Sequence, residues 1–206
     1  MLGTCFKALG VTAVYAMQLH DPLVIGTFPV PLYDITLESV WANVIKQQII
    51  KNEIESSWCI ASPDQGGLER AQRVADLCGL PVVSIQKTRM QQDAPVVHDL
   101  QGDVEGKHVI LIDDIVDTAG TLSKAAELLI SKGAESVRAF CTHPVLSGKA
   151  FEKVDSSKLT ELIVTDTIPL RGHSDKIKVL SSAELFASVI RRVYEYSSIS
   201  PLFIKI

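Results

Sequence analysis

The stretch "HVILIDDIVDTAGTLSKAAELL", residues 108–129, contains the residues best suited to chemistry. An apolar run leads directly to Asp113 and Asp114, a third carboxylate follows at Asp117, and Thr-Ala-Gly-Thr comes next. Charged groups are costly to bury, so three carboxylates at the end of a buried strand need a functional or structural partner. Because side chains alternate along a strand, we expect Asp113 and Asp114 to point to opposite sides of the sheet.

The turn that follows these acids, Thr118-Ala119-Gly120-Thr121, is suited to a phosphate group. It opens a helical pattern, and the first turn of a helix carries unpaired N–H groups and a partial positive charge. Ala119 and Gly120 let phosphate oxygens approach the backbone, and the two threonine hydroxyls can add hydrogen bonds. Carboxylates would repel a phosphate unless they hold something else, and ionised carboxylates accept strong hydrogen bonds from vicinal hydroxyls. This combination describes a ribose 5-phosphate. The alternative is that Asp117 or Thr118 only caps the helix.

The wider pattern places this motif in an α/β protein. Apolar, β-branched runs predict strands at residues 11–17, 57–62, 81–85, 108–113, 136–142 and 161–166. Helical patterns lie between them, near residues 36–51, 65–78, 119–132, 147–154 and 182–194. Such alternation predicts a mostly parallel, twisted sheet flanked by helices, with ligands bound at the carboxyl ends of the strands.

Composition excludes several classes of function. The 206 residues are 47% hydrophobic and 21% charged, with a formal net charge of −4, so nothing indicates a nucleic-acid or membrane binder. No apolar run approaches the roughly 20 residues of a membrane-spanning helix, and we find no signal-peptide pattern. The four cysteines are widely spaced without a CxxC pair, which favours reduced core thiols and a cytoplasmic location.

The first residues raise a question of domain organisation. Residues 3–10, "GTCFKALG", look like the tail of a helix, and a strand pattern follows directly. We therefore expect residues 1–30 to be the remnant of a truncated N-terminal domain. Residues 31–206 are expected to form the domain that carries the ribose 5-phosphate site.

Several motifs carry a family resemblance. The stretch "VILIDDIVDTAGT" resembles the phosphoribosyl diphosphate signature of phosphoribosyltransferase-fold proteins. The stretches at residues 62–71, 102–122, 142–150 and 164–170 resemble the ribose-phosphate diphosphokinase family. This resemblance implies a phosphoribosyltransferase type I-like fold. It also implies an enzyme that transfers the diphosphoryl group of Mg-ATP to the anomeric hydroxyl of ribose 5-phosphate, giving phosphoribosyl diphosphate and AMP for nucleotide biosynthesis.

The resemblance also implies roles at the sugar and on a mobile loop. Asp113 and Asp117 would bind sugar hydroxyls, with Asp114 beside them, while residues 117–121 would hold the 5-phosphate. Two basic residues, Lys87 and Arg89, match the family's mobile catalytic loop, which we place at residues 86–98. They would neutralise charge on the transferring phosphoryl group. The alternative is a solvated loop without a catalytic role, since Thr88 and Met90 stand where the family has Arg and Pro.

His20 and Asp64 match the family's residues around the Mg²⁺ cofactor. The alternatives are a structural histidine at a strand end and, for Asp64, a helix N-cap. The family has an Asp where this chain has Gln18. His143 follows a predicted strand and could line the nucleotide pocket. Among other residues, Arg70 and Arg73 are interpreted as a solvated helix face, and Trp41 and Trp58 as core or interface residues.

Three functions therefore remain open. The first is the synthetase itself. The second is a catalytically weak regulatory or binding subunit, because the family's ATP-binding segments of the first domain have no counterpart here. The third is a base-transferring phosphoribosyltransferase. The expected partners are ribose 5-phosphate and ATP. A homo-oligomer, or a chain supplying the missing domain, is also expected, with residues 28–35 and 200–206 as apolar contact surfaces.

Overall fold

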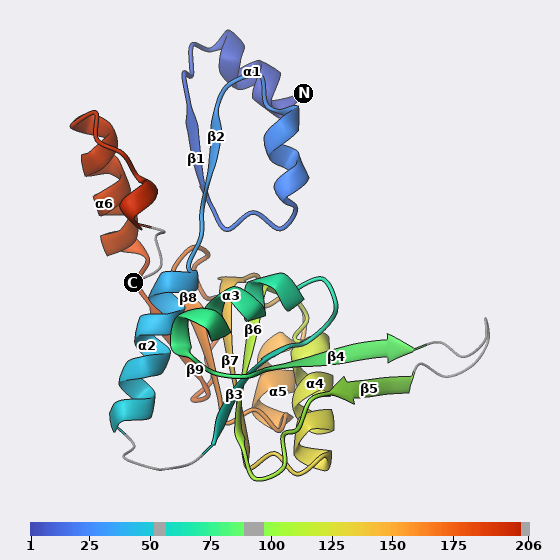
Figure 1. Ribbon diagram of the computed structural model, residues 1–206. Coiled ribbons are helices and arrows are strands. Elements are labelled where there is room, and N and C mark those ends of the chain that lie inside the picture. The colour runs from blue at the N-terminus through green and yellow to red at the C-terminus, as the bar shows by residue number, and fades with distance from the viewer. Residues whose placement is uncertain (52–56, 89–96, 203–206) are drawn as a thin grey trace. The chain divides into compact units, whose positions relative to one another are not determined.

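The computed structural model describes residues 1–51, 57–88 and 97–202, and the chain forms two compact units, residues 1–37 and 38–206. The first unit holds a small parallel sheet (Figure 1). Its elements are α1 (Leu2–Ala8), β1 (Val14–Met17), the 3-10 helix η1 (Pro22–Thr27) and β2 (Leu32–Ile35). Leu32 and Ile35 are buried, so this part of the predicted contact surface at residues 28–35 contributes to the packing of the protein itself. Whether this unit is the remnant of a larger domain stays a prediction.

The second unit is built on a seven-stranded sheet. Its elements begin with α2 (Glu38–Lys51), β3 (Trp58–Ser62), α3 (Leu68–Cys78), β4 (Val82–Thr88), β5 (Val97–Gln101) and β6 (His108–Val116). They continue with α4 (Gly120–Ser131), β7 (Ser136–Pro144), α5 (Ala150–Ser156), β8 (Glu161–Thr165), β9 (Ile177–Leu180), α6 (Ala183–Tyr194) and η2 (Ser200–Leu202).

The strand order is β5-β4-β3-β6-β7-β8-β9, and every neighbouring pair is parallel except β4 with β5. Helices cover both faces, with α2 and α3 on one side and α4 and α5 on the other (Figure 1). The predicted α/β class with a mostly parallel sheet is confirmed. The central position of β6 explains its apolar run, because a strand that is covered on both faces alternates little between apolar and polar residues.

The helices follow from their apolar spacing. The buried residues of α4 are Leu122, Ala125, Ala126 and Leu129, an i, i+3, i+4, i+7 pattern that faces the sheet. Gly133, with φ of 92°, follows the end of this helix and leads the chain back to β7. Among the helices that the structure describes, none combines the length and apolar character needed to cross a bilayer.

Three strands were missed and one loop prediction was partly wrong. β2, β5 and β9 are edge or short strands whose sequences lack a clean apolar run. The predicted loop at residues 86–98 is strand at both ends, since residues 86–88 belong to β4 and residues 97–98 to β5, with Lys87 opposite His98. Residues 89–96 lie outside the described part of the chain.

Candidate functional site

Polar residues gather where parallel strands end at one edge of the sheet. β3 ends at Ser62, β6 carries the acids, and β7 places Cys141 opposite Asp113 and His143 opposite Ile115. Parallel strands present their carboxyl ends together, so residues far apart in the sequence meet at this edge. This edge was predicted as the ligand side, and the acids and the turn lie there.

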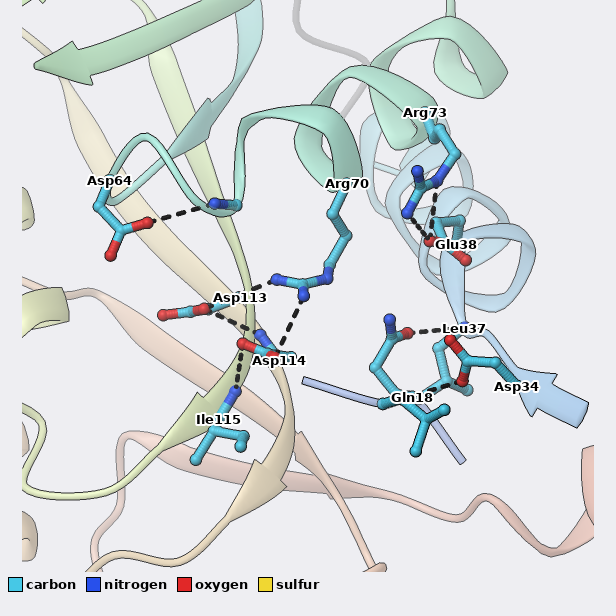
Figure 2. Close-up of polar contacts among 12 residues, drawn as sticks. Gln18, Asp34, Leu37, Glu38, Asp64, Arg70, Arg73, Asp113, Asp114 and Ile115 are labelled. Atoms are coloured by element: carbon cyan, nitrogen blue, oxygen red, sulfur yellow. Dashed lines mark hydrogen bonds and ion pairs between the residues drawn. The ribbon is translucent and has the colours of Figure 1, made fainter. Parts of the chain in front are cut away.

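Asp113 and Asp114 share one partner, the guanidinium of Arg70 on α3. An Arg70 nitrogen, Nη2, lies 3.2 Å from Oδ2 of Asp114, and Nη1 lies 3.8 Å from Oδ1 of Asp113 (Figure 2). The expectation that the two carboxylates point apart is therefore wrong, because both lie within ion-pair distance of the same cation. The interpretation of Arg70 as a solvated residue is also wrong: its side chain is only 11% exposed.

Short backbone contacts fix the two acids further. The amide of Asp114 donates to Oδ1 of Asp113 at 2.9 Å, and the amide of Ile115 donates to Oδ1 of Asp114 at 3.0 Å (Figure 2). Burial and the neighbouring Asp114 carboxyl raise the pKa of Asp113 to about 7, while Arg70 and the Asp114 amide act against that rise. Asp113 therefore changes charge near neutral pH, which few carboxyls do.

The third acid, Asp117, is exposed and lies in the turn after β6. Its Oδ1 accepts a short hydrogen bond from the hydroxyl of Ser147, and its carbonyl accepts from the Ser147 amide at 3.1 Å. The amide of Leu146 donates to the carbonyl of Val116 at 3.0 Å. The loop after β7 thus holds the turn after β6 by three hydrogen bonds.

The turn itself leaves the start of α4 open. Ala119 is the N-cap residue with φ of 58°, a left-handed conformation that is unusual for alanine, and no side chain caps the helix. The first hydrogen bond into the helix is donated by the Ser123 amide to the Ala119 carbonyl, so the first-turn amides have no partner within the helix. Thr118 and Thr121 are exposed beside them. The alternative that Asp117 or Thr118 caps this helix is not what the structure shows.

The loop between β3 and α3 is fixed by Asp64 and Gly67. Oδ1 of Asp64 accepts the Gly67 amide at 3.2 Å (Figure 2). The Asp64 carbonyl accepts the Ser62 hydroxyl at 2.5 Å. A Cβ on Gly67 would lie 2.8 Å from the Ser62 hydroxyl, so a larger residue there would displace that hydroxyl. The alternative that Asp64 is the N-cap of α3 is wrong, because the N-cap residue is Gly67 and no side chain caps the helix; the Gly67 amide occupies one of the two carboxylate oxygens of Asp64.

A comparison with protein families shows which family the chain belongs to. The family model described as "Phosphoribosyl synthetase-associated domain" matches residues 62–204. The chain belongs to this family. The match includes Asp64, Arg70 and every residue from Asp113 to Thr121.

Relatives of this family cover the chain almost completely. It is 48% identical over 204 residues to a ribose-phosphate pyrophosphokinase of Wolinella succinogenes and 46% identical over 204 residues to one of Campylobacter jejuni. In both cases 99% of this chain and 64% of the relative are covered, so the chain spans about 64% of the length of these curated relatives. The crystal structure of phosphoribosylpyrophosphate synthetase from Mycobacterium smegmatis matches 95% of this chain and 63% of that one, at 31% identity and a TM-score of 0.85.

The two basic residues expected on the family's catalytic loop are placed only in part. Lys87 lies in β4, paired with β5, and Arg89 lies outside the described residues. A strand position one residue from the end of β4 puts the Lys87 backbone at the start of the segment expected to move. The catalytic roles of both residues stay predictions.

The residues expected near a metal belong to different units. His20 is exposed in the first unit and Asp64 is half-buried in the second. Within the described parts of the chain, no group of three or more His, Cys, Asp or Glu side chains could hold a metal ion. Mg²⁺ is commonly bound by one or two carboxylates together with water and substrate phosphates, so an isolated Asp64 still fits that chemistry.

Gln18, at a position where the resemblance implies an acid, is built into the fold of the first unit. It is buried, has φ of 45°, and its Oε1 accepts the Leu37 amide at 3.2 Å (Figure 2). An aspartate in the same unit, Asp34, accepts the Leu19 amide at 2.9 Å. The side chain of Gln18 therefore stabilises the end of β1 rather than presenting a charge.

The other residues singled out in the sequence have different surroundings in the structure. His143 is half-buried, and its Nδ1 lies 2.9 Å from the Thr167 hydroxyl, so it is tied to the loop after β8. Trp41 and Trp58 are buried, as expected for core residues. Arg73 is partly exposed, at 43%, but bonds to buried Glu38 through Nε at 3.1 Å and Nη2 at 2.9 Å.

The cysteines are all free thiols, as predicted, although only two of the four are core residues. Cys59 and Cys141 are buried, whereas Cys5 is exposed and Cys78 is half-buried.

Proposed function

We propose that this protein is a ribose-phosphate diphosphokinase, which transfers the diphosphoryl group of Mg-ATP to the anomeric hydroxyl of ribose 5-phosphate. The observation that carries the proposal is the meeting of three carboxylates with the uncapped start of α4 at one edge of the sheet. In this reaction the anomeric oxygen bonds to the β-phosphorus of ATP and gives up its proton, while the bond from that phosphorus to the α,β-bridging oxygen breaks and AMP leaves with that oxygen.

The sugar would be recognised by carboxylates. Asp113 and Asp117 would accept hydrogen bonds from ribose hydroxyls, which strengthen when the acceptor is ionised. The exposure of Asp117 and the partial exposure of Asp113, whose side chain is 18% exposed, support this assignment. Asp114 is only 3% exposed, so it would not contact the sugar directly. It would help to fix the position of the neighbouring Asp113.

The 5-phosphate would be seated on the first turn of α4. The amides of Gly120 and Thr121 would donate to phosphate oxygens, with the hydroxyls of Thr118 and Thr121 beside them, because a helix start favours an anion. Ala119 supports this assignment: its left-handed backbone turns the chain so that helix amides follow directly after Thr118.

The donor side would depend on Lys87, Arg89 and a divalent cation. Lys87 and Arg89 would neutralise charge on the transferring phosphoryl group and on the departing AMP. The cation, proposed as Mg²⁺, would be held near Asp64 and would lower the charge of the ATP phosphates when bound. A role of His20 toward the cation stays a separate prediction.

A second function is favoured by one observation. Gln18 stands where the family has an acid and uses its amide oxygen inside the first unit. A chain without that charge could bind ribose 5-phosphate and turn over slowly, as a regulatory or binding subunit that associates with a full-length synthetase.

One experiment separates the two functions. The purified chain is mixed with ribose 5-phosphate and Mg-ATP, and AMP release is measured beside a Lys87→Ala variant, while calorimetry measures ribose 5-phosphate binding to both. AMP release well above that of the variant supports the synthetase. Binding without AMP release supports the regulatory subunit, and absence of both contradicts each proposal.

Partners and location follow as part of the same proposal. The proposed partners are ribose 5-phosphate and ATP, with a homo-oligomer or a chain supplying further ATP-binding segments. A cytoplasmic location is supported by the four free thiols, since disulfides are rare in reducing compartments.

A further inference from the structure

The buried acid pair at the end of β6 depends on a cation from another element. Asp114 is 3% exposed, and Nη2 of Arg70 on α3 is the cationic group 3.2 Å from its Oδ2. A carboxylate that is removed from water is stable in its ionised form only with such a partner. Arg70 therefore supplies a positive charge beside the buried Asp114 carboxylate in the folded protein.

Arg70 also links the acid pair to the loop that carries Asp64. Arg70 lies three residues after Gly67, and a Cβ on Gly67 would be 3.7 Å from both Nη1 of Arg70 and the Ile112 carbonyl. The start of α3 is thus packed against the end of β6, and the guanidinium spans the two elements (Figure 2). Movement of Arg70 would leave Oδ1 of Asp113 bound to the Asp114 amide but without the cation that it shares with Asp114.

The second arginine on the same helix shows that this contact is specific. Arg73, one turn further along α3, pairs with Glu38 and Glu69 and makes its ion pairs away from the acid pair. Both arginines carry the same charge on the same helix, but only Arg70 reaches the carboxylates proposed to bind sugar. The two side chains differ in burial and in partners: Arg70 is 11% exposed and contacts the end of β6, whereas Arg73 is 43% exposed and contacts Glu38 and Glu69.

We infer that Arg70 is a positioning residue for sugar recognition: it pairs with buried Asp114 and helps to fix the Asp113 carboxylate in the orientation that accepts the ribose hydroxyls. This inference rests on the proposed function and adds a specificity determinant from a helix outside the signature motif. Arg70 acts through Asp113 and Asp114 and does not itself contact the sugar. Its loss should therefore change which sugar phosphates bind, in addition to how tightly they bind.

The test compares two ligands that differ in one hydroxyl. Calorimetry measures the Kd of ribose 5-phosphate and of 2-deoxyribose 5-phosphate for the wild-type chain, Arg70→Met and Arg73→Met. A hydrogen bond to an ionised carboxylate should give the wild type a preference for ribose 5-phosphate of about tenfold or more. In Arg70→Met this preference should fall to within about twofold, while Arg73→Met, the matched control on the same helix, keeps it.

Two further variants keep the test decisive if Arg70→Met does not fold. Arg70→Met combined with Asp114→Asn removes both buried charges together, so it should fold and still lack the preference. Arg70→Lys retains a cation with a single donor group and should recover part of the preference. Wild-type preference in the double variant would overturn the inference.

The possible results separate the inference from the proposed function. If the wild-type chain binds neither sugar phosphate, the proposed function and the inference both fail. If the wild type binds and Arg70→Met shows the same preference, only the inference fails. An equal loss of affinity for both ligands in Arg70→Met would show a purely structural role and would also overturn it.

Discussion

The hydroxyl of Ser147 donates to the carboxylate of Asp117, which joins the loop after β7 to the turn after β6. The two residues are thirty positions apart in the sequence. The contact holds Asp117 in place although the side chain is exposed. An oriented carboxylate loses less conformational freedom when a ligand binds, so this hydrogen bond is expected to strengthen sugar binding.

Ser147→Ala should weaken ribose 5-phosphate binding by about threefold to tenfold, the value of one hydrogen bond. Calorimetry provides the measurement. Ser156→Ala is the matched control, because the Ser156 hydroxyl bonds only within its own helix, to the Glu152 and Lys153 carbonyls. Unchanged affinity in Ser147→Ala would show that the contact does not orient Asp117 for the ligand.

Asp113 should make stability depend on pH. Its pKa rises from an ordinary value of 3.8 to about 7 in the folded protein, through burial and the facing Asp114, against the opposing effect of Arg70. An acid with a raised folded-state pKa binds more protons in the folded than in the unfolded chain between these values. Its contribution to the free energy of unfolding is therefore full below about pH 4 and is lost as pH rises to about 7.

Asp113→Asn should remove this dependence. Relative to the wild type, the variant should gain roughly 2 to 4 kcal/mol in the free energy of unfolding between pH 4 and pH 8. Urea unfolding at several pH values measures the difference. A constant difference across this range would contradict the raised pKa. Asp76→Asn, an exposed acid on α3 that bonds to Gln72, serves as the control.

Ala119 is expected to be sensitive to side-chain branching. Its φ of 58° lies in the left-handed region, which β-branched residues rarely adopt. Ala119→Val should lower the free energy of unfolding by about 1 to 2 kcal/mol more than Ala125→Val, a position of similar burial in the regular part of α4. Thermal unfolding of the two variants gives the comparison, and equal losses would show that burial alone determines the cost.

Thr118 and Thr121 should affect binding without affecting stability. Both are exposed, so Thr118→Val with Thr121→Val should change the free energy of unfolding by no more than about 1 kcal/mol, or about 0.5 kcal/mol per site. The same change should weaken ribose 5-phosphate binding by about tenfold or more, since two hydroxyls that are proposed to bond to the phosphate are lost. Thr160→Val, at another exposed threonine, should leave affinity unchanged. If the double variant binds like the wild type, the phosphate lies elsewhere.

The local pattern of apolar residues was sufficient to predict the main helices and strands. Helices predicted at residues 36–51 and 119–132 were found at Glu38–Lys51 and Gly120–Ser131, because apolar spacing marks a helix regardless of its neighbours. Gly133 also marks the end of the second helix. β5 and β9 were missed because pairing at the edge of the sheet, rather than an apolar run, makes those residues strands. A pairing partner is not visible in a local pattern.

The sequence alone determined the α/β class, the position of Asp113, Asp114 and Asp117 at a strand's carboxyl end, and the phosphate-suited turn after them, since each depends on residues close together in the chain. Only the tertiary structure decided that Arg70 binds both acids and that Ser147 holds Asp117. An ion pair or hydrogen bond between distant residues depends on how strands and helices pack. Arginine on an amphipathic helix looks solvated until the facing strand is known to present buried carboxylates.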